Sequence, residues 1–270
     1  MLTWLLLGVA VALGVLAVTT RRRAAGAARR LAAAAHELES LQAAFARFAP
    51  AQVVEDIIAG GISTRSEAKE VTVLFADLQG FTALTERLEP ARLVAVLNGF
   101  FEAMSRAIAA HRGHLAKFLG DGLLALFGAL EHDPWQAHDA VRAALAMRRA
   151  LAEYNQTIVR DGIPRLVLGI GIHRGPVVAG VIGTTELVEY GVVGGVVNLA
   201  SRVEGLTRVH GADILITAAV RSALDGRFRL RALPAVKVKG VPEPLVTFAV
   251  EGADDAESRG AQGPPGAGMK

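Results

Sequence analysis

The sequence predicts an α+β domain in which two long helices alternate with a mainly antiparallel sheet. An apolar run over residues 71–77 predicts a strand, and two short apolar segments around the turn at 120–122 predict a hairpin. Apolar residues recur at helical spacing over 90–111 and 133–159. This βαββαβ order, completed by the strand candidates that follow, is typical of a ferredoxin-like core.

The elements after the second helix complete this core and add to it. Strand candidates at residues 166–172 and 177–182 are joined through Gly175-Pro176, a pair that usually marks a turn. The further predicted elements are a helix over residues 196–209 and strands over 214–217, 227–230 and 245–250.

Residues 1–20 carry no charged side chain and are mostly Leu, Val, Ala and Gly. As a helix they span roughly 30 Å, which is enough for one membrane crossing. Five arginines follow within residues 21–30, and positive charge beside a span favours the cytoplasmic side. We therefore expect a single-pass anchor in the cell membrane, with residues 1–30 in contact with lipid and the rest of the chain in the cytoplasm.

The charge balance excludes a basic nucleic-acid binder. The chain has 29 basic and 26 acidic residues, a formal charge of +3. The five early arginines contribute +5 of this charge, so the rest of the chain sums to about −2. We expect no nucleic-acid partner, and anionic lipid headgroups suit the arginines better. The absence of cysteine excludes disulfides and thiolate metal sites.

Residues 21–69 are expected to form a basic juxtamembrane segment and a helical linker. Apolar side chains between Leu31 and Phe48 alternate at spacings of three and four, which is the a/d pattern of a short coiled coil. A single amphipathic helix that packs on its own domain explains the same pattern, and both alternatives stay open. The folded domain is expected over residues 70–251, with a disordered tail over 252–270.

The strand at residues 71–77 ends in Asp77, and a polar turn with Gly80 follows. A carboxylate at a strand end is a hard oxygen ligand, and backbone N–H groups of a turn face an anion. This arrangement is typical of a metal and phosphate site, and the alternative is that Asp77 only caps the next helix. Asp121 faces Asp77 if the hairpin pairs beside this strand, so that two carboxylates can hold two Mg²⁺ ions. In isolation Asp121 is an ordinary turn residue.

Three motifs together resemble the class III nucleotidyl cyclases, which are the adenylyl and guanylyl cyclases. They are FADLQGFT at residues 75–82, KFLGDG at 117–122 and GGVVNLASR at 194–202. Ordered motifs at compatible spacing are far more specific than any single one, and the resemblance covers roughly residues 65–251. It implies the same core with C-terminal additions, and conversion of ATP to 3′,5′-cyclic AMP and pyrophosphate with two Mg²⁺ or Mn²⁺ ions per site.

The resemblance also implies roles for the residues around the first motif. The metal ligands are Asp77, Asp121 and the carbonyl of Leu78. One ion would lower the pKa of the ribose 3′-hydroxyl, and the other would neutralise the leaving pyrophosphate. The backbone that cradles phosphate oxygens belongs to Gln79, Gly80, Phe81 and Thr82.

Asn198 and Arg202 are four residues apart, so they share one face of the predicted helix. An amide and a guanidinium together can position a ribose and neutralise charge on the α-phosphate, and by resemblance this is the transition-state helix. The alternative is an Asn near a helix start and a surface Arg. By resemblance Lys239, in KVKGVPEP, binds phosphate, and Lys237 is the competing candidate.

By resemblance Lys117 reads the base, because its ammonium donates a hydrogen bond to N1 of adenine, and this points to ATP. The chain departs from the family at Gly191, where a second base-reading side chain is usual, and at Gly195, where Asp is often found. Two alternatives stay open: a low-activity, cyclase-like module that binds nucleotide and dimerises, and a guanylyl or relaxed-specificity cyclase.

The resemblance further implies a homodimer with two equivalent sites. Each site would combine the metal aspartates of one subunit with Lys117, Asn198 and Arg202 of the other, across an isologous C₂ interface. A parallel coiled coil in the linker would bring both subunits together from one side of the membrane.

Overall fold

The computed structural model describes residues 32–33, 35–36, 66–184 and 188–254. The chain divides into two compact units, residues 1–62 and 63–270, and the sheet belongs to the second. The predicted anchor, most of the predicted coiled-coil segment and the tail beyond residue 254 lie outside the described residues. Within the described ranges, no helix is long and apolar enough to cross a membrane.

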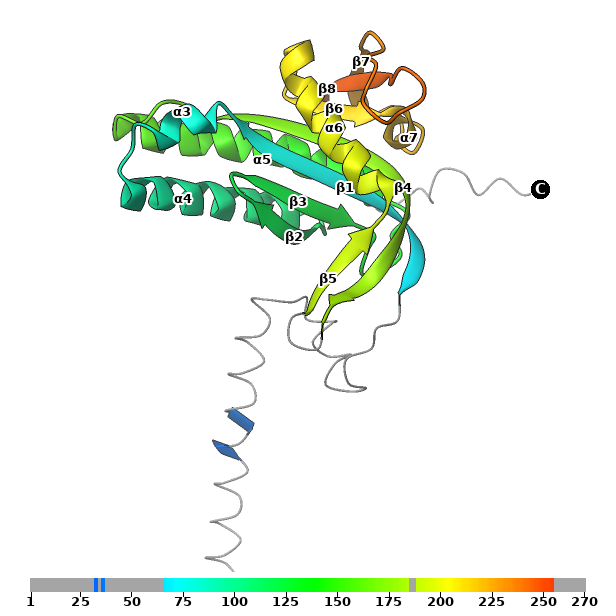
Figure 1. Ribbon diagram of the computed structural model, residues 1–270, viewed down its shortest axis with the longest axis horizontal. Coiled ribbons are helices and arrows are strands. Elements are labelled where there is room, and N and C mark those ends of the chain that lie inside the picture. The colour runs from blue at the N-terminus through cyan, green and yellow to red at the C-terminus, as the bar shows by residue number, and fades with distance from the viewer. Residues whose placement is uncertain (1–31, 34, 37–65, 185–187, 255–270) are drawn as a thin grey trace, which may run out of the picture. The chain divides into compact units, whose positions relative to one another are not determined.

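The second unit is built on one eight-stranded sheet of order β2-β3-β1-β4-β6-β8-β7, in which β5 pairs with β4 (Figure 1). The strands are β1 (Glu67–Gln79), β2 (His114–Leu119), β3 (Gly122–Phe127), β4 (Val167–Gly183), β5 (Val188–Val193), β6 (Ile214–Thr217), β7 (Phe228–Ala232) and β8 (Thr247–Ala253). The helices are α3 (Phe81–Thr85), α4 (Pro90–Ala109), α5 (Gln136–Arg160), α6 (Gly195–His210) and α7 (Ala218–Arg221). The portion β1-α4-β2-β3-α5-β4, with strand order β2-β3-β1-β4, has the βαββαβ arrangement that the sequence predicts.

The central strand β1 is buried on both faces. Leu74 and Ala76 belong to the main core, which they share with α4 and α5. Val71 and Val73 belong to a second cluster, which they share with α6. Because successive side chains of a strand point to opposite faces, Asp77 lies on the same face as Val71 and Val73. The strand therefore delivers Asp77 toward α6, and α4 and α5 support it from behind.

The predicted turn at Gly175-Pro176 is wrong. The strand β4 runs without interruption from Val167 to Gly183, and these two residues pair with Val71 and Glu70 of β1. A Cβ at Gly175 would lie 2.9 Å from Cγ2 of Val196, so the glycine serves a close approach of α6 to the strand. Glycine in a strand marks a close approach as readily as it marks a turn.

Two strand ends differ from the predicted boundaries. The strand β1 begins at Glu67, inside the predicted linker, because its first residues pair with the far end of β4 as far as Ala179. The strand β8 continues to Ala253, inside the predicted disordered tail, where it pairs with Phe228 of β7. In both places pairing with a neighbouring strand extends an element that the local sequence does not mark.

Candidate active site

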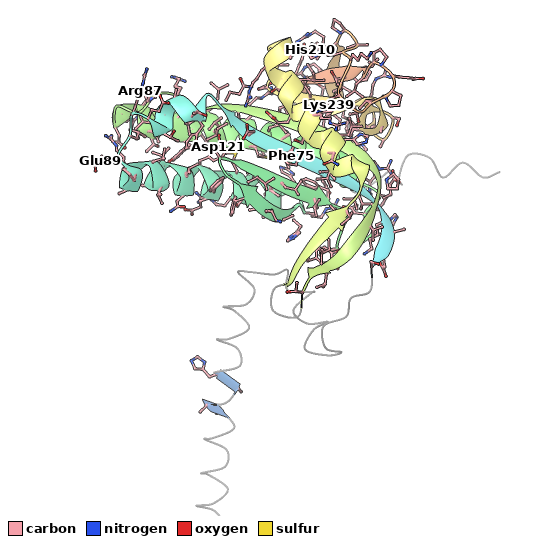
Figure 2. All side chains as sticks on the ribbon, viewed as in Figure 1. Phe75, Arg87, Glu89, Asp121, His210 and Lys239 are labelled. Atoms are coloured by element: carbon pink, nitrogen blue, oxygen red, sulfur yellow. The ribbon has the colours of Figure 1, made fainter. Side chains whose placement is uncertain are left out.

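Asp77 and Asp121 meet at the ends of neighbouring strands. The register of β1 on β3 pairs Ala76 with Leu123, so Asp77 lies beside Gly122. A Cβ at Gly122 would lie 2.9 Å from Oδ1 of Asp77, so only glycine leaves this space to the carboxylate. Asp121 directly precedes Gly122 in the β2–β3 turn, and Figure 2 labels it at this end of the hairpin.

The electrostatics of Asp77 show that these two carboxylates act on each other. Burial first, and the charge of Asp121 second, raise the pKa of Asp77 above its ordinary value, while Arg208 opposes both effects. Two like charges on a rigid sheet are a strained arrangement that a cation relieves. The predicted pair is therefore brought together as the sequence analysis expects.

The same residues fit a divalent ion. Asp77 and Asp121 offer hard carboxylate oxygens, and the carbonyl of Leu78 is next to Asp77 in β1. In the described part of the chain, no group of three or more acidic, His or Cys side chains could hold a metal. Two carboxylates are sufficient for Mg²⁺, which takes its remaining ligands from phosphate and water.

The turn after β1 has the backbone that its sequence implies. Gly80 is left-handed, with φ of 73°, and it precedes α3 as the N-cap without any side-chain capping bond. Asp77 therefore does not cap this helix, which removes the alternative role for that residue. Phe81 is buried under the turn, whereas Gly80 and Thr82 are exposed. A pocket of about 150 Å³ borders the turn and includes Arg87 in its lining.

Helix α6 brings two residues to this site that the sequence analysis missed. Nη2 of Arg208 donates to Oδ2 of Asp77 at 2.9 Å. Glu204 is 7% exposed. Burial first, and the charge of Asp77 second, raise the pKa of Glu204 to about 7. The carboxylates Asp77, Asp121 and Glu204 thus share one electrostatic environment with the guanidinium of Arg208.

Two glycines of β4 allow α6 to lie this close. A Cβ at Gly169 would lie 2.5 Å from Oε1 of Glu204, and a Cβ at Gly171 would lie 2.1 Å from the backbone nitrogen of Glu204. Gly169 pairs with Asp77 in the sheet, which explains why Glu204 lies near that carboxylate. The side chain of Gln79 also reaches α6, where Nε2 donates to Oγ1 of Thr207 at 3.3 Å. The alternating glycines at 169 and 171 are a sequence signal for a close approach to this strand, although they do not show which element makes it.

The predicted transition-state and phosphate-binding residues form a second group. Asn198 is exposed and Arg202 half-buried on α6. A Cβ at Gly240 would lie 3.1 Å from Nη1 of Arg202, so the loop that carries Lys239 lies against this guanidinium. Lys237 and Lys239 are both exposed, and Lys239 is the one adjacent to Gly240. Figure 2 labels Lys239 in this loop, away from the β2–β3 turn.

Lys117 and the two unusual glycines lie at other places on the sheet. Lys117 is exposed on β2, at a bulge where the register on β3 shifts. Gly191 of β5 pairs with Gly180, and a Cβ there would make only an ordinary contact, 3.5 Å from Cδ1 of Ile182. A Cβ at Gly195 would meet nothing within 4 Å. Space therefore does not require glycine at either position.

Comparison with known proteins identifies the family. Residues 64–252 match the adenylate and guanylate cyclase catalytic domain. The chain is 36% identical over 231 residues to an adenylate cyclase of Anabaena cylindrica, a match that covers 80% of this chain and 44% of that protein. It is 33% identical over 210 residues to adenylate cyclase 1 of Rhizobium meliloti, with coverage of 77% and 32%. The chain thus spans less than half the length of these curated relatives.

Solved structures agree with this match. The crystal structure of the guanylyl cyclase Cya2 is similar with a TM-score of 0.67 and 37% identity, and the match covers 70% of this chain and 95% of that one. The adenylyl cyclase CyaB from P. aeruginosa is similar with a TM-score of 0.65 and 30% identity, with coverage of 74% and 100%. The chain belongs to the family of adenylate and guanylate cyclase catalytic domains.

Proposed function

We propose that this protein is a membrane-anchored class III adenylyl cyclase, which converts ATP to 3′,5′-cyclic AMP and pyrophosphate. The observation that carries the proposal is the pair of carboxylates Asp77 and Asp121, which meet beside the Gly80 turn. The curated relatives named adenylate cyclase support the choice of reaction.

In this mechanism, Asp77, Asp121 and the carbonyl of Leu78 hold two divalent cations. Bound Mg²⁺ or Mn²⁺ supplies the positive charge that lowers the pKa of the ribose 3′-hydroxyl and stabilises the leaving pyrophosphate. The backbone N–H groups of residues 79–82 would bind phosphate oxygens, and the left-handed Gly80 sets the shape of this turn.

The second group of residues supplies the rest of the site. Asn198 orients the ribose, and Arg202 neutralises the charge that grows on the α-phosphate. Lys239 binds the terminal phosphates, with its loop held against Arg202. Lys117 selects adenine by donating to N1, and Gly191 has no side chain that could make a second contact to the base.

We propose that each site combines the two groups across a homodimer. Among the described residues, the side chain that bonds to Asp77 is Arg208 rather than Asn198, Arg202 or Lys239, so we infer that one chain holds two half-sites. Apolar side chains also lie exposed on strands of the same sheet. They are Phe118 and Leu119 of β2, Val178 and Ile182 of β4, and Val193 of β5. Such side chains are suited to burial against a second copy.

Residues 1–20 are proposed to anchor the protein in the cell membrane, with residues 1–30 in contact with lipid and the catalytic domain in the cytoplasm. The arginines that follow the apolar run are the basis for this orientation. The expected result is that the full chain stays with membranes after carbonate extraction. Recovery in the soluble fraction of a mature protein without these residues would refute the anchor.

The test of the proposed reaction is incubation of the purified protein with Mn²⁺ and either ATP or GTP, with the cyclic product identified by mass. We expect cyclic AMP from ATP as the main product. Formation of cyclic GMP from GTP at a similar or higher rate would favour the guanylyl or relaxed-specificity alternative, which the likeness to guanylyl cyclase Cya2 keeps open. Nucleotide binding without any cyclic product would favour the low-activity dimerisation module.

A further inference from the structure

Glu204 presents an unusual acceptor beside the candidate metal site. The residue is 7% exposed. Among the described residues its Oε1 is buried and accepts no hydrogen bond. A buried polar atom without a partner costs free energy, so it needs a reason to be retained. The hydroxyl of Thr207 lies close by, since a Cβ at Gly169 would lie 2.5 Å from it as well as from Oε1 of Glu204, and it donates no hydrogen bond to this oxygen.

A donor suited to this acceptor lies one helical turn away. Arg208 follows Glu204 by four residues, so both side chains project from the same face of α6. The guanidinium nevertheless bonds across to Oδ2 of Asp77 at 2.9 Å, and half of the Arg208 side chain is exposed. It is thus held by a candidate metal ligand, while Oε1 of the buried Glu204 on its own helix has no hydrogen-bond donor among the described residues.

We propose that Arg208 is a positioning residue with two alternative carboxylate acceptors, which we call its two seats. It bonds to Asp77 while the site has no metal, and it moves to Glu204 when a divalent cation binds to Asp77. The inference rests on the proposed function, because it assumes that Asp77 is a metal ligand. Asp77 is thereby paired with a cation both before and after the metal binds.

The chemistry of the two seats supports the exchange. A carboxylate oxygen that ligates a divalent cation is a poorer acceptor, and the cation repels a guanidinium in the same place. Arg208 is partly exposed and long, so it can rotate without a change in α6. Glu204 is fixed by the close packing of α6 on Gly171, so the second seat is formed in advance.

The experiment is a double-mutant cycle on metal affinity, which does not depend on turnover. Binding of Mn²⁺ to the full chain without nucleotide is measured by electron paramagnetic resonance of the free ion. Arg208→Gln removes the competitor at Asp77, and we expect binding about threefold tighter. Glu204→Gln removes a nearby negative charge and the second carboxylate acceptor of Arg208. We expect Mn²⁺ to bind about tenfold more weakly when Arg208 is present, and about threefold more weakly in the Arg208→Gln background.

The exchange predicts that Glu204→Gln weakens Mn²⁺ binding more in the presence of Arg208 than in the Arg208→Gln background. If Arg208 simply moved into solvent, Glu204→Gln would weaken binding equally, or less, when Arg208 is present, and this result would overturn the inference. Arg208→Lys should restore part of the coupling, since an ammonium can occupy both seats with fewer donors. The matched control is the exposed pair Glu102 and Arg106, also four residues apart, for which the same cycle should show no effect on Mn²⁺ binding.

A further variant separates this inference from the proposed function. Asp77→Asn should weaken Mn²⁺ binding strongly in the wild-type background. If Asp77→Asn has no effect, the metal site of the proposed function fails and the inference falls with it. If Asp77→Asn weakens binding but the Glu204–Arg208 cycle is additive, only the two-seat role of Arg208 is wrong.

Discussion

Replacement of Glu204 by Gln should change how the stability of the metal-free protein depends on pH. Burial raises the pKa of Glu204 from 4.5 to about 7, so the folded chain keeps a proton that the unfolded chain releases. The stability from this group is fully present below pH 4.5, and it is lost as the pH rises through 7. The shift of about 2.5 units corresponds to about 3 kcal/mol at 1.36 kcal/mol per unit.

The Glu204→Gln variant has no titratable group at this position, so its free energy of unfolding should not show this decrease as the pH rises. The assay is urea denaturation with a chelator present, from pH 4.5 to pH 8, and the quantity of interest is the variant minus wild-type difference. We expect this difference to rise by about 3 kcal/mol in favour of Gln across the range. Titrating groups that do not interact with Glu204, such as the buried His138, cancel in the difference.

The control is Glu153→Gln on the exposed face of α5, for which the difference should stay flat. A flat difference for Glu204→Gln as well would show that Glu204 is ionised in the folded chain at neutral pH. In that case the reasoning from its burial and from the charge of Asp77 would be refuted.

Three further outcomes follow from the site and its packing. Asp77→Ala and Asp121→Ala should each abolish cyclic nucleotide formation with little change in the thermal transition, because each removes a ligand at a strand end; loss of the transition together with activity would assign the aspartates to folding. Gly171→Ala should destabilise the domain by at least about 2 kcal/mol in urea denaturation, because the new Cβ would meet the backbone of Glu204 at 2.1 Å. Gly205→Ala on the same helix meets nothing within 4 Å, and should instead stabilise by about 0.5–1 kcal/mol; equal effects of the two substitutions would contradict the packing of α6.

Much of the fold follows from local pattern. The helix over 196–209 and the strand over 214–217 were predicted to within a residue of α6 and β6, because apolar spacing and glycine punctuation mark both. The turn at Gly175-Pro176 was wrong, since the same two residues also suit an extended strand over which α6 lies closely. Local sequence does not reveal which of these a glycine serves.

The sequence motifs of the candidate site were predictable, whereas the contacts that helix α6 makes with its carboxylates were not. Asp77 and Asp121 can be recognised in the sequence, because each lies at the end of a predicted strand with glycine close by. Glu204 and Arg208 cannot, because a charged pair at helical spacing ordinarily marks a solvated face. Their role depends on the pairing of Gly169 with Asp77, which joins segments far apart in the sequence. Only the register of β1 on β4 brings α6 over the carboxylates.

The most direct test of the central claim is complementation between two inactive variants. Asp77→Ala and Arg202→Ala chains are mixed at several ratios under conditions where subunits exchange, and cyclic AMP formation is measured. A shared site predicts that each variant alone is nearly inactive, and that a mixed dimer regains up to roughly half of the wild-type activity, because one of its two sites is whole. If mixed dimers form and no ratio restores activity, Asp77 and Arg202 do not act across a subunit interface.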